Sequence, residues 1–350
     1  MIFYTYIKHQ LQFNFEARTS RGEIKTHDAF IIIANDKLNN RFGIGEASPL
    51  TGLSIDSIPD FEIQLQAILL QLNEGVSLSN IDLQNFPSIR FALEAAQLNL
   101  QFENKAVYFN NNWINSGAIP INGLVWMNES ESMLKEAIEK AEKGFDCIKF
   151  KIGALDFDEE CRMLEKFRKS FSDSRVQIRL DANGAFLPDE ALYKLKELNR
   201  FSVHSIEQPI RQKQWDAMQE IIAKSPIDIA LDEELIGLDV FSEGKKLMDY
   251  LKPDYLILKP TLIGGLGVAD EWIKWTTYFN KSWWATSALE SNIGLNIIAQ
   301  WCSTKESRMH QGLGTGSLYH NNFEAPFVAE KGYLFYIPSD SWKFPQAWFN

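Results

Sequence analysis

The second part of the sequence repeats one pattern, in which a short run of apolar and β-branched residues is followed by an amphipathic stretch. From residue 121 onward eight such runs occur, and they read INGLVW, CIKFKIG, VQIRLDAN, VHSIEQPI, IDIALDEEL, YLILKPTLIGG, WWATSALES and MHQGLGTG. Strand and helix signals in alternation predict a parallel sheet joined by helical crossovers. Eight units of about 25 residues each fit a small βα barrel.

A doubly wound open sheet is built from the same units and is the alternative architecture. That fold needs a glycine-rich phosphate loop after an early strand. Neither GxGxxG nor GxxxxGK[ST] occurs in such a place in this sequence. We therefore favour the barrel over the open sheet.

The first 115 residues show a different order of strand and helix signals. Two strand-like stretches, IFYTYIKHQLQFNFEA and DAFIIIA, precede the loop-like GIGEASPLTGLS. Helical patterns follow over residues 58–72 and from Pro87, a residue suited to a first helical turn. We predict an α+β domain over residues 1–115, a barrel domain over residues 116–320, and a C-terminal segment, residues 321–350, that packs back on the first domain.

The charge and cysteine content of the chain argue against several classes of binding partner and cellular location. The formal net charge of −11 argues against nucleic acid or an anionic membrane, because both select clustered lysine and arginine. The three cysteines are widely spaced without a CxxC pair, which indicates buried thiols in a reducing compartment. No run approaches 18 apolar residues, and the N-terminus lacks a signal-peptide pattern. We expect a cytoplasmic protein that binds a small carboxylate molecule.

Acidic residues stand where consecutive predicted strands end. Asp181, Glu207 and Asp232 are 26 and 25 residues apart, so each falls near the C-terminal end of its strand, where barrel active sites are built. Adjacent strands lie about 4.8 Å apart, which lets three carboxylates converge. A set of carboxylates without histidine or cysteine favours Mg²⁺ over Zn²⁺.

Lysines occupy neighbouring strand ends. Lys149 and Lys151 share one face of the second run, and Lys259 ends the sixth. Residues two apart on a strand are separated by about 6.6 Å, and two ammonium groups at that distance repel by about 2.5 kcal/mol at an effective dielectric of 20. We expect this repulsion to lower the pKa of one of the two lysines by about two units and to make that lysine a general base. A base beside a Lewis-acidic metal suggests proton abstraction from carbon next to a carboxylate.

Each feature also has an ordinary structural explanation. A Lys-x-Lys pair is often the solvated face of an edge strand, and an Asp at a strand end often belongs to a turn or helix cap. Arg179 can balance carboxylates inside the barrel, and Ser287 with Glu290 can cap a helix that begins near residue 291. Six charged residues on five consecutive strand ends favour one joint site instead.

The motifs KFK, LDAN, IEQP, LDEE and LKPTLIGG, on the second to sixth runs, resemble the enolase superfamily and specifically its muconate-lactonizing subgroup. The resemblance covers nearly the whole chain, since the first domain is similar to that family's capping domain and GIGEASPLTG is similar to its substrate-covering loops. It implies an α/β fold of the enolase-like kind, namely a (β/α)7β modified TIM barrel with an N-terminal α+β capping domain.

The resemblance also implies a reaction. RLDAN, SALESNIGL and GLGTGSLYHNNF are most similar to members that carry out the Mg-dependent syn dehydration of 2-succinyl-6-hydroxy-2,4-cyclohexadiene-1-carboxylate to 2-succinylbenzoate, a step of menaquinone biosynthesis. Lys151 would remove the α-proton and return it to the departing hydroxyl. Lys149 would help to hold the substrate carboxylate. Lys259 would stabilise a metal-bound enediolate from the opposite face.

The resemblance implies a set of metal ligands and a surrounding set. The ligands of Mg²⁺, for which Mn²⁺ is a substitute, would be Asp181, Glu207 and Asp232. Asn183 and Glu233 match positions that orient the metal site, while Arg179 and Ser287 are candidates for substrate contacts.

Two alternatives stay open at this point. An N-acylamino-acid racemase or a dipeptide epimerase of the same superfamily would use Lys151 and Lys259 to exchange an α-proton between two faces. The seventh run reads SALESN where a dipeptide epimerase is expected to carry an Asp-x-Asp pair. The non-enzymatic alternative is a degenerate metal-binding barrel that acts as an interaction protein. A homo-oligomer also stays open, because the tryptophans near residues 272–284 suit either an oligomer surface or the packing of outer helices.

Overall fold

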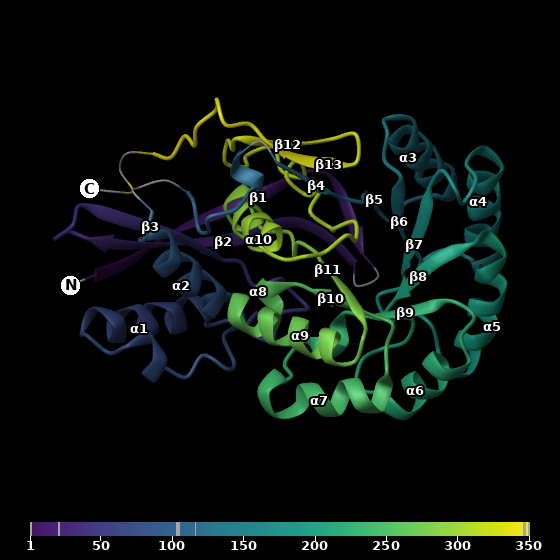
Figure 1. Cartoon of the computed structure of the whole chain (residues 1–350), viewed down its shortest axis with the longest axis horizontal. Helices are drawn as coiled ribbons and strands as arrows, with labels where there is room; N and C mark the ends of the chain where they lie inside the picture. The colour runs from purple at the N-terminus through teal and green to yellow at the C-terminus, as the bar shows by residue number, and fades with distance from the viewer. Residues whose placement is uncertain (1, 20–21, 103–105, 116, 346–347, 349–350) are drawn as a thin grey trace.

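An antiparallel sheet with two helices precedes a parallel barrel in this chain, and Figure 1 shows the first in purple to blue and the second in teal to green. The computed structural model describes residues 2–19, 22–102, 106–115, 117–345 and 348. The predicted order of an α+β part followed by a βα barrel is confirmed by this arrangement.

The strands and helices have the following bounds: β1 Ile2–Thr19, β2 Gly22–Asp36, β3 Arg41–Ala47, α1 Phe61–Asn73, η1 Leu78–Asn80, α2 Pro87–Asn99, η2 Trp113–Asn115, β4 Ala118–Pro120, β5 Gly123–Val125, α3 Ser130–Glu142, β6 Cys147–Lys151, α4 Phe157–Ser170, β7 Gln177–Asp181, α5 Pro188–Leu198, η3 Asn199–Phe201, β8 Val203–Glu207, α6 Trp215–Lys224, β9 Asp228–Leu231, η4 Glu233–Leu235, α7 Val240–Leu251, β10 Tyr255–Leu258, α8 Pro260–Ile263, α9 Leu266–Tyr278, β11 Ser282–Ala285, α10 Asn292–Ser303, β12 Phe327–Glu330 and β13 Tyr333–Tyr336. Within the described residues, no helix is both long and apolar enough to cross a membrane.

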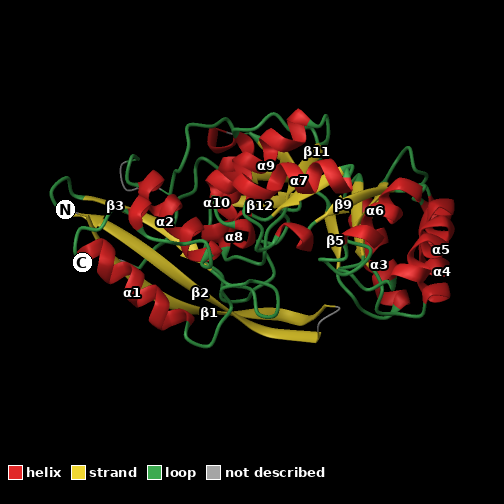
Figure 2. Ribbon diagram, turned by 90° about the horizontal axis from the view of Figure 1, so that it is seen from below, coloured by secondary structure: helices red, strands yellow, loops and turns green. Residues whose placement is uncertain are grey.

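The first sheet has the order β1-β2-β3 and is buried on both faces along β2. Successive side chains of a strand point to opposite faces. Phe30 and Ile32 therefore pack with α1 and α2, whereas Ala29 and Ile31 join the core shared with the barrel. Figure 2 shows the long β1–β2 ribbon extending beyond α1.

Helix α1 begins at Phe61, three residues after the start expected from the apolar pattern. Ile58 precedes Pro59, and a residue before proline is disfavoured in the helical conformation. Residues 58–60 form a turn instead, in which the Phe61 amide donates to the Ile58 carbonyl oxygen at 3.1 Å. Helix α2 begins at Pro87, as the sequence predicts.

The barrel sheet contains seven hydrogen-bonded parallel strands in the order β11-β10-β9-β8-β7-β6-β5. The eighth run adds no named strand in the described chain. It bridges the two sheet edges through the isolated pairs Ile121↔Gln311 and Thr286↔Gly312. Helices cover the outside, where Phe150 of β6 meets Phe167 of α4 edge to face at 5.3 Å. The predicted βα units thus form a barrel that is closed by this last segment.

Two glutamates of the first domain, the buried Glu46 and the partly buried Glu94, bind the N-termini of barrel helices. Glu46 of β3 accepts hydrogen bonds from the Ser291 and Gly294 amides at 2.8 and 2.7 Å, at the start of α10. Glu94 of α2 accepts from the Leu266 amide at 2.7 Å, at the start of α9. The first amides of a helix have no intrahelical partner, so both contacts satisfy such amides and fix the first domain against the barrel.

The C-terminal segment contacts both domains. Strands β12 and β13 form a sheet with β4, in the order β12-β13-β4. Asn321 binds β1 through the Gln12 amide at 2.9 Å and the Gln10 carbonyl at 2.8 Å. The predicted domain limits stay a proposal, and residues 1, 116, 349 and 350 at those limits lie outside the described part. Trp272 and Trp284, which suited an oligomer surface, are buried inside the barrel domain.

Candidate active site

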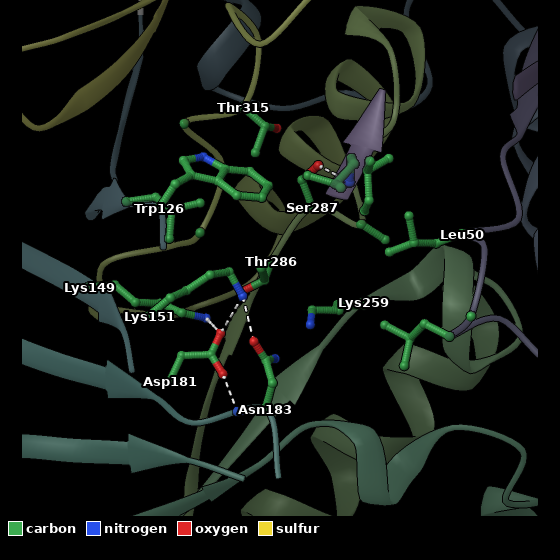
Figure 3. Close-up of a pocket in the computed structure, with 18 of the residues that line it drawn as sticks. Leu50, Trp126, Lys149, Lys151, Asp181, Asn183, Lys259, Thr286, Ser287 and Thr315 are labelled. Carbon is green, nitrogen blue, oxygen red and sulfur yellow. Dashed lines mark hydrogen bonds and ion pairs between the residues drawn. The ribbon is translucent and has the colours of Figure 1, made fainter. Parts of the chain in front are cut away.

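A cavity of about 560 Å³ opens at the carboxyl ends of the barrel strands and is covered by the first domain. Its polar part is lined by Lys149, Lys151, Asp181, Asn183 and Lys259. Residues 24–26 of β2 and the loop of residues 50–53 line its outer part. Figure 3 shows the lysine ammonium groups and the Asp181 carboxylate pointing toward one another.

Lys149, in the middle of β6, is held by two carboxylates. Its Nζ lies 3.0 Å from Asp181 Oδ2 and 2.5 Å from Glu207 Oε2. Its side chain is 6% exposed. Two acids on the two next strands thus compensate one buried ammonium group.

Lys151 lies two residues further along the same face and reaches the cavity more openly, with a side chain that is 13% exposed. Its Nζ lies 3.0 Å from Asp181 Oδ2 and donates to Asn183 Oδ1 at 2.7 Å. The Asn183 amide nitrogen Nδ2 in turn donates to Glu233 Oε1 at 3.0 Å. Asn183 has a φ of 44°, a left-handed conformation that asparagine tolerates better than most residues. Asn183 therefore orients Lys151 between two acidic groups.

Lys259 follows β10 and enters from the opposite side of the barrel. Its Nζ contacts Asp232 in a close ion pair and lies 3.9 Å from Glu207 Oε1. The three lysines and three predicted ligands therefore form one connected network across β6 to β10. Asp181 lines the cavity directly, whereas Glu207 and Asp232 lie behind the lysine ammonium groups.

The lysine pKa values correct one expectation. Repulsion between two lysines predicts a lowered pKa, but the pKa of Lys149 is raised, because Asp181 and Glu207 outweigh the burial that opposes its charge. The pKa of Lys259 is raised for the same reason, with Asp232 as its main partner. The repulsion argument omitted these carboxylates, and they decide the direction.

The acids respond to the same network in different ways. Burial alone would raise the pKa of Asp181, but Lys149, Lys151 and Lys259 bring it below its usual range. Burial raises the pKa of Asp232 well above its usual range, in spite of Lys259. Without further positive charge nearby, Asp232 thus holds a proton more readily than an ordinary aspartate does.

The donor set fits a hard divalent cation. Asp181 and Glu207 are register partners on β7 and β8, and Asp232 follows β9. Glu207 Oε1 is buried without a hydrogen-bond partner, which buried carboxylate oxygens seldom are. Among the described residues, no three His, Cys, Asp or Glu side chains converge on one point, because lysines hold the carboxylates. A cation at this position would be bound by the Glu207 oxygen and would reduce the electrostatic repulsion between the neighbouring carboxylates.

The two candidates for substrate contact lie in different places. Ser287 lines the cavity and donates to Glu290 Oε2 at 2.6 Å. Arg179 does not line the cavity in the described structure; it is buried inside the barrel, where its guanidinium lies 3.9 Å from the centre of the Trp284 ring. Its Nη1 donates to the His310 carbonyl at 2.7 Å. In this placement Arg179 serves as a cation of the barrel interior, and its contact with substrate stays a prediction.

Sequence reasoning missed the apolar part of the cavity wall. Trp126 and Leu124 line it from β5 and the residue after it, and Leu50 and Leu53 line it from the loop of the first domain. Trp126 packs edge to face on Phe15 of β1 at 5.3 Å, so both domains fix its ring. Alternation along INGLVW places residues 122, 124 and 126 on one face, and this signal could have identified them.

Comparison with known proteins agrees with this geometry. Residues 132–339 match the family described as Enolase C-terminal domain-like. The o-succinylbenzoate synthase of Desulfotalea psychrophila is 38% identical over 94% of this chain and 98% of its own. The crystal structure of MenC from the same organism has a TM-score of 0.85 and 35% identity, covering 95% of this chain and 99% of that one.

More distant relatives share the fold. The L-Ala-D/L-Glu epimerase of Bacillus subtilis is 21% identical over 76% of this chain and 75% of its own. The o-succinylbenzoate synthase of Thermosynechococcus elongatus, solved with Mg in its active site, has a TM-score of 0.73 at 20% identity and covers 88% of this chain and 92% of that one. The family match covers more than half of the chain and extends into the C-terminal segment, and the resemblance to the enolase superfamily is confirmed. This chain belongs to the Enolase C-terminal domain-like family.

Proposed function

We propose that the chain is an o-succinylbenzoate synthase, a hydro-lyase that dehydrates 2-succinyl-6-hydroxy-2,4-cyclohexadiene-1-carboxylate to 2-succinylbenzoate. The observation that carries this proposal is the pairing of a full-length relative of that name, 38% identical, with a cavity that holds all three predicted lysines. The epimerase relative is far less similar, at 21% identity.

The lysines would do the acid and base work. Lys151, the most exposed of the three, would accept the α-proton as the ring C–H bond breaks and the new double bond forms. The same proton would then pass to the hydroxyl on the same face, so that the C–O bond breaks and water leaves. Lys149 and Lys259 would hold the negative charge that develops on the substrate carboxylate.

Asp181, Glu207 and Asp232 would hold Mg²⁺, or Mn²⁺ in its place. The ion, when bound, would supply Lewis-acid charge to the substrate carboxylate. Asn183, through Lys151 and Glu233, would keep the base directed at the cavity. The enzyme would work in the cytoplasm, at a step of menaquinone biosynthesis.

A second candidate is an N-acylamino-acid racemase. Lys151 and Lys259 enter one cavity from β6 and β10, on opposite sides of the barrel, which suits exchange of an α-proton between two faces. The non-enzymatic candidate has less support, because none of the six charged residues of the site is missing.

The test is to incubate the purified protein with the cyclohexadiene and Mg²⁺ and to follow loss of the diene absorbance, with the product identified by mass spectrometry. Conversion to 2-succinylbenzoate supports the proposal. A diene that persists, beside a positive control enzyme that consumes it, contradicts the proposal.

A further inference from the structure

Gln208 directly follows the proposed metal ligand Glu207 and takes no part in the reaction proposed for this cavity. Its side chain is fully buried, and it is not among the described residues that line the cavity. Its backbone is left-handed, with a φ of 40°. Residues with a Cβ atom seldom adopt this conformation, and a residue before a proline, as Gln208 is, favours an extended one. Such a conformation persists only where the surrounding contacts determine it.

The side-chain amide of Gln208 makes four hydrogen bonds at the barrel mouth. Its Oε1 accepts from the amides of Asp232 and Glu234 at 3.2 and 3.3 Å. Its Nε2 donates to the Ile210 carbonyl oxygen at 3.1 Å and to Glu234 Oε2 at 3.2 Å. Backbone amides only donate and carbonyl oxygens only accept, so these partners fix the orientation of the Gln208 amide. The Gln208 side chain thus binds the backbone of a second proposed metal ligand, Asp232.

The backbone of Gln208 joins the neighbouring strands as well. Its amide donates to the Ala230 carbonyl oxygen of β9 at 2.9 Å, and its carbonyl oxygen accepts from the Gly184 amide, in the loop after β7, at 2.7 Å. Gln208 therefore connects β7, β8 and β9, which are neighbours in the barrel sheet (Figure 1). Each of these strands has one proposed metal ligand at its end, namely Asp181, Glu207 and Asp232.

Glu234 restrains the Gln208 amide from the other side. Glu234 is 3% exposed, and its Oε1 accepts from the Lys213 amide at 2.8 Å and from Trp215 Nε1 at 2.7 Å. Its Oε2 accepts from Gln208. The carboxylate is thus bound through both oxygens, and it keeps the Gln208 amide from rotating away from Asp232.

We propose that Gln208 is a positioning residue for the metal site, which holds the ends of β7, β8 and β9 at the spacing that lets their three carboxylates bind one cation. This inference rests on the proposed function, because that function assigns Mg²⁺ to those carboxylates. A neutral amide orients the Asp232 backbone without adding charge beside the ligands. Replacement of a residue that orients metal ligands usually lowers metal affinity by about 10- to 100-fold.

The test is the dissociation constant of Mg²⁺, measured by isothermal titration calorimetry without substrate, for the wild-type protein and for Gln208→Met. Methionine is similar in length to glutamine but lacks the amide. We expect the variant to bind Mg²⁺ about 10- to 100-fold more weakly. Gln208→Gly serves as a second variant if Gln208→Met does not fold. Glycine adopts a positive φ readily, so a loss of affinity in that variant reports on the missing amide.

A matched control is Gln300→Met in α10, which removes the amide of another fully buried glutamine. Gln300 Oε1 accepts from the Tyr108 amide at 2.9 Å, and its Nε2 donates to the Ala106 carbonyl oxygen at 2.8 Å and to Asn296 Oδ1 at 3.0 Å. Gln300 is not among the described residues of the cavity wall. Both methionine variants should lower the free energy of unfolding in urea, but only Gln208→Met should weaken Mg²⁺ binding.

A measurement on the metal-free protein addresses the same contact. The Asp232 and Glu234 amides lose their acceptor in Gln208→Met. Hydrogen exchange followed by NMR should therefore show faster exchange at these two amides than in the wild-type protein, and Gln300→Met should leave their rates unchanged relative to other barrel amides.

Wild-type Mg²⁺ affinity in Gln208→Met, or an equal loss of affinity in Gln300→Met, would overturn the positioning role. Unchanged exchange of the Asp232 and Glu234 amides would overturn it as well. A wild-type protein that binds no Mg²⁺ would overturn it together with the metal site. Mg²⁺ binding without dehydration of the diene speaks against the proposed substrate instead, because the affinity measurements need no turnover.

Discussion

Lys151 Nζ lies 3.0 Å from Asp181 Oδ2, so the proposed base and a proposed metal ligand meet at one carboxylate oxygen. Lys149 Nζ contacts the same oxygen at 3.0 Å. A cation bound by Asp181 would compete with both lysines for it. The proposed base and the proposed metal site are therefore coupled through Asp181.

Replacement of Lys151 by alanine should remove the base and leave the binding groups in place. We expect kcat to fall by about 10²- to 10⁴-fold, the usual contribution of a general base. Affinity for 2-succinylbenzoate, measured by calorimetry, should change far less. The matched control is Lys166→Ala, an exposed lysine of α4. Near-full turnover by the Lys151→Ala variant in saturating Mg²⁺ would contradict its role.

Chelation should abolish activity, and added Mg²⁺ should restore it. Because the ion would bind the native state, Mg²⁺ should raise the free energy of unfolding by about 2.7 kcal/mol at a hundredfold excess over its Kd. The melting temperature should rise accordingly. Asp232→Asn should lose this thermal shift as well as activity. Full activity in excess chelator would refute the metal site.

Lys149→Met should destabilise the metal-free protein. The ammonium lies 3.0 Å from Asp181 and 2.5 Å from Glu207, and its removal leaves these buried carboxylates without that partner. Loss of one partner of a buried ion pair costs about 3–5 kcal/mol. Urea unfolding should show this loss, and saturating Mg²⁺ should reverse part of it by replacing the missing positive charge. A loss that Mg²⁺ leaves unchanged would argue against a metal at Asp181 and Glu207.

The burial of Glu46 beside α10 should make stability depend on pH. Burial raises the pKa of Glu46 to about 7 from an ordinary value of 4.5, which we take for the unfolded chain. The native state thus holds this proton more tightly, so its contribution is complete below pH 4.5 and is lost as pH rises through 7. The loss is on the order of 3 kcal/mol.

Glu46→Gln should flatten this dependence. The free energy of unfolding in urea at pH 5 and pH 8, compared between variant and wild type, isolates Glu46, because the other buried acids are common to both proteins. Parallel pH profiles for the two proteins would show that Glu46 does not titrate as described.

The repeat of strand and helix signals was sufficient to predict the barrel and the strand ends that carry the lysines and acids, because position along a βα unit fixes position at the barrel mouth. The direction of the lysine pKa values could not be predicted in this way. It depends on which carboxylate each ammonium meets, and Lys149 meets Glu207 from 58 positions away.

Contacts between segments that are distant in the sequence could not be predicted either. Glu46 and Ser291 are 245 residues apart, and nothing local in GIGEASP indicates a helix N-terminus as its partner. The packing of Arg179 on Trp284 joins residues 105 positions apart, and no local pattern in the sequence indicates it. The eighth run predicts a strand, yet in the described chain it makes isolated bridges instead. Its Gly312 allows close packing on Thr286, because a Cβ atom there would lie 2.5 Å from Thr286 Oγ1.

We propose that this cavity dehydrates a cyclohexadiene carboxylate. One measurement tests it most directly: kcat/KM for loss of the diene with Mg²⁺, beside the rate of α-deuteration of an N-succinylamino acid by the same preparation in deuterated water. We predict rapid diene loss without comparable deuteration. Fast α-deuteration with slow dehydration would contradict the claim and identify the site as that of a racemase.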